Sequence, residues 1–273
     1  MIRLGLIGNG KWGANYPKAA FEAGNCTVTD VAGRDWRKLL DRMIDAFIVA
    51  TPPDARLEIC SELLARNRPV MIEKPLALDV DSALAITAGF VGEGLPFLVN
   101  HQHLFAPAYE TLRDIAGTWD DFEIVSCGEG PGPIRDYSAL WDYGPHDVAM
   151  VLGLGIGRVV RARRRNGGFE ISLVDETSRR EALVRVSNAA DEKHRVFNVI
   201  RDSGETISYN DRAEAKLQRW WFPVPVSPEK PLTRSVRAFA EAVKTGRTDW
   251  RFGSFGLEAV RILEEADKQM MEA

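Results

Sequence analysis

The chain has 273 residues, a length that fits one large domain or two domains of ordinary size. Hydrophobic residues make up 45% and charged residues 27%, which is the balance of a globular protein with a packed core. The formal net charge of −4 gives no general attraction for nucleic acid or anionic lipid, and no apolar stretch approaches the roughly 18 residues that a membrane span requires. We therefore expect neither nucleic acid nor a membrane as a partner.

Strand and helix patterns alternate over the first hundred residues. Short apolar runs predict strands at 2–7, 28–33, 46–50, 70–72 and 96–100. Stretches with helical spacing or composition predict helices at 13–23, 35–42, 55–66 and 79–91. This alternation is typical of a doubly wound parallel sheet, so we predict an α/β, Rossmann-type dinucleotide-binding domain over residues 1–104.

The pattern changes after a helix expected at 108–115. Strands then follow one another at 123–127, 158–164, 169–174, 181–186, 195–200 and 206–209, with one helix at 144–152 among them. Gly167-Gly168 and Ser203-Gly204 indicate hairpin turns, and a proline-rich link over 223–231 precedes two closing helices. We predict an α+β domain over 105–273, with a mostly antiparallel open sheet and C-terminal helices, that holds the substrate and a subunit contact.

A glycine turn follows the first strand and opens the first helix, with the sequence Gly8-Asn9-Gly10-Lys11-Trp12-Gly13. Gly8 allows the tight turn, Gly10 lets the backbone approach a pyrophosphate, and Gly13 lets the helix close on the sheet. The N–H groups and the dipole of the helix start favour the negative charge of the phosphates. These six residues are candidate cofactor-binding residues.

The end of the second strand is expected to contact the adenosine ribose. An acid there would bond the 2′-hydroxyl of NAD, whereas a small residue followed by arginine accommodates the 2′-phosphate of NADP. The sequence reads Ala32-Gly33-Arg34-Asp35. With Gly33 in the acid position Arg34 meets the phosphate and the cofactor is NADP, and with Asp35 in that position it is NAD. We favour NADP and name Arg34 as a cofactor contact.

Further chemistry-bearing residues stand at strand ends and at a helix start. Thr51-Pro52 and Glu73-Lys74 each end a strand of the first domain, where open α/β sheets bind ligands, so we add them to the cofactor site. Asp142 and His146 lie four residues apart and share one face if their helix begins by Asp142. Histidine is suited to accept the proton of a hydroxyl, a lysine polarises the oxygen, and an aspartate orients the ring.

Together these motifs resemble the glucose–fructose oxidoreductase and inositol dehydrogenase family, often called Gfo/Idh/MocA, over nearly the whole chain. The resemblance rests on three segments above all: the glycine turn, Glu73-Lys74-Pro75, and the spacing of Asp142 and His146. It implies that Lys74, Asp142 and His146 are catalytic, with histidine as the usual proton acceptor. The sequences around the glycine turn and Leu140-Trp141-Asp142 look most like members that act on nucleotide-linked sugars.

The chain departs from this family in two places. Only about ten residues separate the second strand from the third, so a helix and a strand usually found there are expected to be missing on the adenosine side. His103 stands where the family often has an arginine, and it is either a substrate contact or a surface histidine. Tyr143 is a second candidate substrate contact.

The sequence thus predicts an enzyme: an NAD(P)-dependent dehydrogenase or reductase that acts on a secondary alcohol or ketone of a sugar, cyclitol or nucleotide sugar. Two alternatives remain: a noncatalytic NAD(P)-binding regulator, and a nucleotide-sugar enzyme that recycles bound NAD. We expect a cytoplasmic homo-oligomer, a dimer or a tetramer. Because Cys26, Cys60 and Cys127 are far apart and show no CxxC spacing, we expect no disulfide framework and no metal site.

Overall fold

The computed structural model describes residues 1–132, 137–165 and 167–272 and divides into two compact units. The first unit consists of Met1–Phe105 and Glu229–Val260, and the second of Ala106–Pro228 and Arg261–Ala273. These units differ from the expected domains in two respects, because Phe105 and Glu229–Val260 belong to the first unit rather than to the second.

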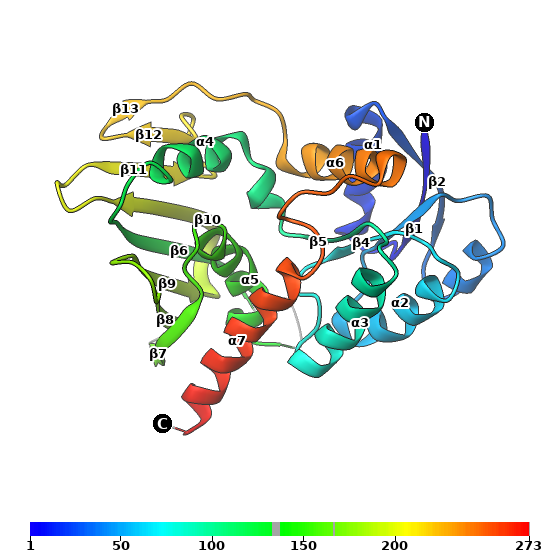
Figure 1. The fold of residues 1–273 in the computed structure, drawn as a ribbon, viewed down its shortest axis with the longest axis horizontal. Helices are drawn as coiled ribbons and strands as arrows, with labels where there is room; N and C mark the ends of the chain where they lie inside the picture. Colours follow the sequence, from blue (N-terminus) through cyan, green and yellow to red (C-terminus); the bar gives the residue numbers. More distant parts are fainter. Residues whose placement is uncertain (133–136, 166, 273) are drawn as a thin grey trace. The chain divides into compact units, whose positions relative to one another are not determined.

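A parallel sheet of five strands, sheet A, forms the centre of the first unit, in the order β2-β1-β3-β4-β5 (Figure 1). Its strands are β1 (Ile2–Ile7), β2 (Cys26–Ala32), β3 (Ala46–Val49), β4 (Val70–Glu73) and β5 (Phe97–Asn100). Every residue of β3, β4 and β5 is buried, as the continuous apolar runs predicted. The doubly wound parallel sheet is thus confirmed. Strand β2 is an edge strand, so no strand in the described part of the chain continues the sheet on the side where the sequence indicated a missing strand.

Helices and short 3-10 turns connect these strands: η1 (Gly13–Asn15), α1 (Tyr16–Ala23), η2 (Trp36–Leu39), η3 (Pro53–Ala55), α2 (Arg56–Leu64), α3 (Val80–Gly92) and η4 (Gln102–Phe105). The helix expected over 13–23 begins as η1 and becomes α-helical only at Tyr16. Pro17 therefore lies in the first turn of α1, where its missing N–H costs no hydrogen bond. The helix expected over 35–42 is reduced to the single turn η2.

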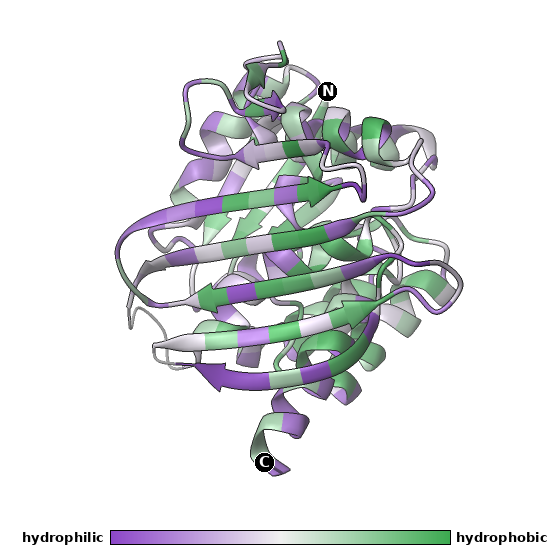
Figure 2. Ribbon diagram, turned by 90° about the vertical axis from the view of Figure 1, so that its left-hand side faces the viewer, coloured by the Kyte–Doolittle hydropathy of each residue, from purple (hydrophilic) through white to green (hydrophobic). Residues whose placement is uncertain are grey.

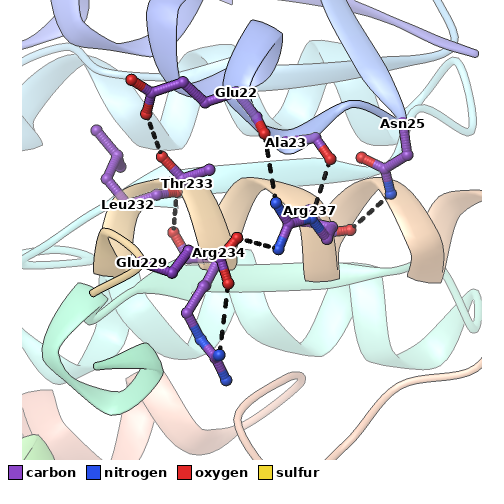
Figure 3. A network of polar contacts seen from close by, with 9 residues as sticks. Glu22, Ala23, Asn25, Glu229, Leu232, Thr233, Arg234 and Arg237 are labelled. Carbon is purple, nitrogen blue, oxygen red and sulfur yellow. Dashed lines mark hydrogen bonds and ion pairs between the residues drawn. The ribbon is translucent and has the colours of Figure 1, made fainter. Parts of the chain in front are cut away.

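The late helix α6 (Pro231–Thr245) packs against α1, which explains why it belongs to the first unit (Figure 3). Arg237 on α6 donates to the carbonyl of Ala23 at 2.9 Å, and its own carbonyl accepts from Asn25 at 3.0 Å. Thr233 donates to the carboxylate of Glu22 at 2.8 Å. Side chains and main chain of α6 therefore satisfy polar groups at the end of α1.

The second unit holds sheet B, in the order β13-β12-β11-β10-β6-β9-β8-β7, in which only β6 and β9 pair in parallel. Its strands are β6 (Glu123–Pro131), β7 (Arg158–Arg165), β8 (Gly168–Val174), β9 (Glu181–Ser187), β10 (Ala189–Ile200), β11 (Thr206–Asn210), β12 (Leu217–Arg219) and β13 (Phe222–Pro223). The expected antiparallel character and both hairpins are confirmed. The short strands β12 and β13 were not predicted.

Helices α4 (Pro107–Ala116) and α5 (Ala139–Leu152) cover one face of sheet B. Among the described residues no helix covers the other face, which is turned to the viewer in Figure 2. The last helix, α7 (Phe255–Glu272), begins in the first unit and ends in the second. No helix in the described part of the chain is both long and apolar enough to cross a membrane.

Candidate functional site

The glycine turn connects β1 to η1, and its three glycines have different surroundings. A Cβ atom on Gly8, whose φ is +112°, would lie 2.5 Å from the carbonyl oxygen of Ala50. A Cβ atom on Gly13 would lie 2.0 Å from the carbonyl oxygen of Gly8, whereas one on Gly10 would meet nothing within 4 Å. Gly8 and Gly13 are therefore required by the folding of the turn itself. Gly10 instead leaves open space above the backbone, as a bound pyrophosphate needs.

The carboxylate of Glu73, at the end of β4, ties the glycine turn to the sheet. Its Oε1 accepts a hydrogen bond from the indole of Trp12 at 2.6 Å and from the amide of Asn100 at 2.9 Å, and also from the hydroxyl of Tyr16. Burial and the charge of Glu73 raise the pKa of Tyr16 well above its usual range, so Tyr16 stays a neutral donor. Sequence reasoning named Glu73 as a cofactor contact and missed this anchoring role.

Arg56, the first residue of α2, is a further residue that sequence reasoning missed. Its side chain is only 2% exposed. It donates to the carbonyl of Thr51 at 2.7 and 3.1 Å, and to the carbonyls of Glu73 and Pro75. One guanidinium therefore fixes the carboxyl ends of β3 and β4, and Lys74 lies between two of its acceptors. The sequence showed no sign of this role, because Arg56 stands within an otherwise ordinary helix pattern.

The carboxyl edge of sheet A also holds polar atoms suited to a ligand. The hydroxyl of Thr51 is buried and has no hydrogen-bond partner among the described residues, and the same holds for Oδ1 of Asn100. Lys74 is half-buried, and Pro52, Asn9 and Lys11 are exposed beside the turn. Together with the space above Gly10, these groups fit a dinucleotide that donates hydroxyl groups and carries phosphates.

The end of β2 presents an exposed arginine and an engaged acid. A Cβ atom on Gly33 would lie 3.0 Å from the side-chain oxygen of Asn9, so this position is close to the glycine turn. Arg34 is exposed. The carboxylate of Asp35 pairs with Lys38, a hydrogen bond that, aided by the lysine's charge, lowers the pKa of Asp35. Asp35 therefore stays ionised in an exposed pair with Lys38.

Helix α5 in the second unit carries Asp142 and His146. The helix begins at Ala139, five residues before the predicted start, so the two residues do lie on one helical face, and both are half-buried. A neighbouring face of the helix is anchored to sheet B by Asp147. This fully buried carboxylate pairs with Arg195 on β10 at 3.0 Å and accepts from Ser126 on β6. Burial raises the pKa of Asp147, and Arg195 opposes that rise.

The two candidate substrate contacts lie in different units. Tyr143 on α5 is buried, and its hydroxyl donates to the carbonyl of Pro131 on β6 at 3.3 Å. His103 lies in η4 of the first unit and is 8% exposed, so it is not a surface histidine. Lys74 likewise belongs to the first unit, and Asp142 and His146 to the second. The structure thus brings the candidate cofactor-binding residues together around the end of sheet A, and Asp142 and His146 together on α5.

Comparison with known proteins adds independent findings. A family model described as an oxidoreductase family with an NAD-binding Rossmann fold, GFO_IDH_MocA, matches residues 10–101. A myo-inositol dehydrogenase of Streptomyces leeuwenhoekii is 29% identical over 147 residues, which cover 50% of this chain and 44% of that enzyme. The chain matches less than half the length of the curated relatives.

Solved structures match over nearly the whole chain. A protein of Magnetospirillum magnetotacticum MS-1, described as an oxidoreductase, is 30% identical with a TM-score of 0.85, over 96% of this chain and 98% of that one. A variant of a 3-ketoreductase from Actinomadura kijaniata, in complex with TDP-benzene and NADP, is 20% identical with a TM-score of 0.77, over 98% of each chain. The second likeness shows the fold alone. The family model, the relatives and the two-sheet fold agree, and the chain belongs to the Gfo/Idh/MocA family of oxidoreductases.

Proposed function

We propose that this chain is an NAD(P)-dependent dehydrogenase or reductase that transfers a hydride between a nicotinamide cofactor and a secondary alcohol or ketone of a sugar, cyclitol or nucleotide sugar. The observation that carries the proposal is the glycine turn, which is closed to a side chain at Gly8 and Gly13 but open at Gly10. The likeness to inositol dehydrogenases supports the substrate class.

We assign the chemistry to Lys74, Asp142 and His146. The cofactor, when bound, accepts or supplies the hydride. His146 accepts the hydroxyl proton as the alcohol is oxidised, Asp142 orients the imidazole from one helical turn away, and Lys74 polarises the substrate oxygen. Tyr143 and His103 are proposed as substrate contacts.

We further propose NADP rather than NAD as the cofactor. Arg34 is exposed at the end of β2, where a small residue followed by arginine accommodates a 2′-phosphate, and Asp35 forms an exposed pair with Lys38. Arginine pairs with a phosphate through two parallel N–H groups, so the 2′-phosphate offers Arg34 a partner that NAD lacks. We also propose a homo-oligomer that uses the uncovered face of sheet B.

A thermal-shift screen with NAD, NADP and their reduced forms tests the proposal first, because a ligand that binds only the folded state raises the melting temperature. The best complex is then assayed on sugars, cyclitols and nucleotide sugars by the absorbance of the reduced nicotinamide. His146→Ala is expected to lower kcat/KM by about 10²–10⁴ while nucleotide binding persists. If none of the four nucleotides raised the melting temperature, the proposal would be refuted. Binding without any turnover would favour a noncatalytic regulator.

A further inference from the structure

The uncovered face of sheet B carries a cluster of three side chains that the proposed redox chemistry does not use. Along β6 the residues alternate between two faces. Ser126 and Gly128 face α5, since Ser126 donates to Asp147 and a Cβ atom on Gly128 would lie 2.3 Å from the same carboxylate. Cys127 and Glu129 therefore project to the other face, which is the one shown in Figure 2.

Strand pairing brings a histidine onto the same face. In the antiparallel ladder of β6 and β10, His194 pairs directly with Glu129, and Cys127 lies two residues before Glu129 on β6. Directly paired residues of neighbouring strands have Cβ atoms about 4.5–5.5 Å apart, and i and i+2 of one strand share a face. Cys127, Glu129 and His194 are all half-buried on this face.

The spacing of the ligand atoms suits a small cation. One atom from each residue, the thiol sulfur, a carboxylate oxygen and an imidazole nitrogen, lies within 4.8 Å of the other two. Nδ1 of His194 is 3.8 Å from Oε2 of Glu129. Bonds of about 2.0–2.3 Å in a tetrahedral zinc site separate ligand atoms by about 3.3–3.8 Å, so the spacing of these three atoms is close to that of a bound site.

We propose that Cys127, Glu129 and His194 form a binding site for Zn²⁺ or a similar borderline divalent cation. A thiolate and an imidazole select such metals over Mg²⁺ and Ca²⁺, which prefer oxygen ligands alone. Three protein ligands leave the fourth tetrahedral position to water. Cys127 and Glu129 also line an open cavity of about 790 Å³ in the single chain.

Four arginines also line this cavity, and three of them pair with the single carboxylate of Glu170: Arg163, Arg165 and Arg185, the fourth being Arg164. Arg185 on β9 lies beside Cys127 in the ladder, but its Nε donates at 2.9 Å to Glu170 on β8. Its charge is thus drawn to the β8 side, whereas His194 lies on β10, on the opposite side of β6. Arg163 and Arg165 share the same glutamate.

The site is separate from the proposed hydride transfer. Helix α5, which carries Asp142 and His146, packs on the other face of sheet B. A cation held here would cross-link β6 and β10 and stabilise the second unit. Cysteine spacing alone predicted no metal, because the cluster exists only through the register of two strands that are distant in the sequence.

Cobalt binding to the chelator-treated protein tests the proposal, since thiolate ligation of Co²⁺ gives a charge-transfer band in the near ultraviolet and tetrahedral geometry gives visible bands. We expect one Co²⁺ per chain with both signals, displaced by Zn²⁺. Cys127→Ser should abolish the charge-transfer band, and Glu129→Gln and His194→Gln should each weaken binding tenfold or more. Glu123→Gln on the same strand and Cys60→Ala on α2 are matched controls that should bind as the wild type does.

Two results would overturn the proposal: cobalt absorbance without the thiolate band, or equal cobalt affinity in the wild type and in all three ligand variants. Circular dichroism verifies that each variant folds. If Cys127→Ser does not fold, the cobalt affinities of Glu129→Gln and His194→Gln decide whether the site exists. Because the readout is metal binding, failure here leaves the proposed dehydrogenase activity untouched.

Discussion

The indole nitrogen of Trp12 donates a hydrogen bond of 2.6 Å to Oε1 of Glu73. This contact joins the glycine turn after β1 to the end of β4, two segments that sequence analysis had linked only through a common ligand. Tyr16 and Asn100 donate to the same oxygen, so hydrogen bonds to one carboxylate link the glycine turn to the ends of β4 and β5. Contacts within the protein therefore hold this candidate cofactor site together.

Replacing Glu73 by leucine removes the common acceptor of this cluster. Tyr16 and Asn100 are buried, so loss of their carboxylate partner is expected to lower the free energy of unfolding by about 1–3 kcal/mol. Urea unfolding monitored by fluorescence measures the change. Glu73→Gln keeps an acceptor oxygen, so its free energy of unfolding should fall clearly less than that of the leucine variant. Equal stability of the leucine variant and the wild type would show that the cluster contributes nothing.

Gly10 and Gly13 offer a matched pair of substitutions within one turn. Gly10→Ala places a methyl group in open space, so the fold should keep its stability while the affinity for NADP or NAD falls tenfold or more. Gly13→Ala places a methyl group 2.0 Å from the carbonyl oxygen of Gly8, which costs at least about 1–3 kcal/mol of stability. Calorimetric titration and thermal unfolding separate the two effects, and unchanged nucleotide affinity in Gly10→Ala would place the phosphates elsewhere.

The strands of sheet A could be predicted from the sequence because buried parallel strands are continuous apolar runs, such as Ala46–Val49. The first residue of α5 could not be predicted in this way. Gly144-Pro145 resembles a first helical turn, yet Pro145 lies inside the helix and the preceding Ala139 and Leu140 are buried. Strands β12 and β13 span three and two residues, too few for an alternating pattern.

The candidate site divides in the same way. The glycine turn and Glu73-Lys74 could be located because a motif follows each strand directly. The role of Arg56 could not, because an arginine on a helix is usually exposed and only the fold places its guanidinium among three main-chain carbonyls. Long-range contacts of this kind depend on tertiary packing rather than on local pattern.

Arg56 gives a prediction about the position of Lys74. Arg56→Met leaves the carbonyls of Thr51, Glu73 and Pro75 without their shared donor, which is expected to cost about 3–5 kcal/mol because the site is buried. Arg56→Lys keeps the charge but offers fewer donors in a different geometry, so it should fold with a smaller loss of stability than Arg56→Met. If Arg56 positions Lys74, the lysine variant should lower kcat more than it raises KM. A stability loss without any change in kcat would limit Arg56 to a structural role.

Glu170 on β8 gives a prediction about pH. Burial alone would raise its pKa, but hydrogen bonds from Arg185, Arg163 and Arg165 outweigh burial and lower the pKa from 4.5 to about 2. A carboxylate whose pKa is depressed in the folded state adds stability that is complete above its unfolded pKa and is lost as the pH falls toward the folded pKa.

Glu170→Gln should therefore destabilise the protein by about 1–3 kcal/mol at pH 7, a range that allows for solvent screening of the half-exposed arginines. The difference from the wild type should shrink as the pH falls from 4.5 toward 2, which unfolding at a series of pH values measures. Glu176→Gln breaks the exposed pair with Arg158 and should change stability by less than about 1 kcal/mol. A difference between Glu170→Gln and the wild type that persists unchanged down to pH 2 would mean that the arginines act through packing rather than through the charge of Glu170.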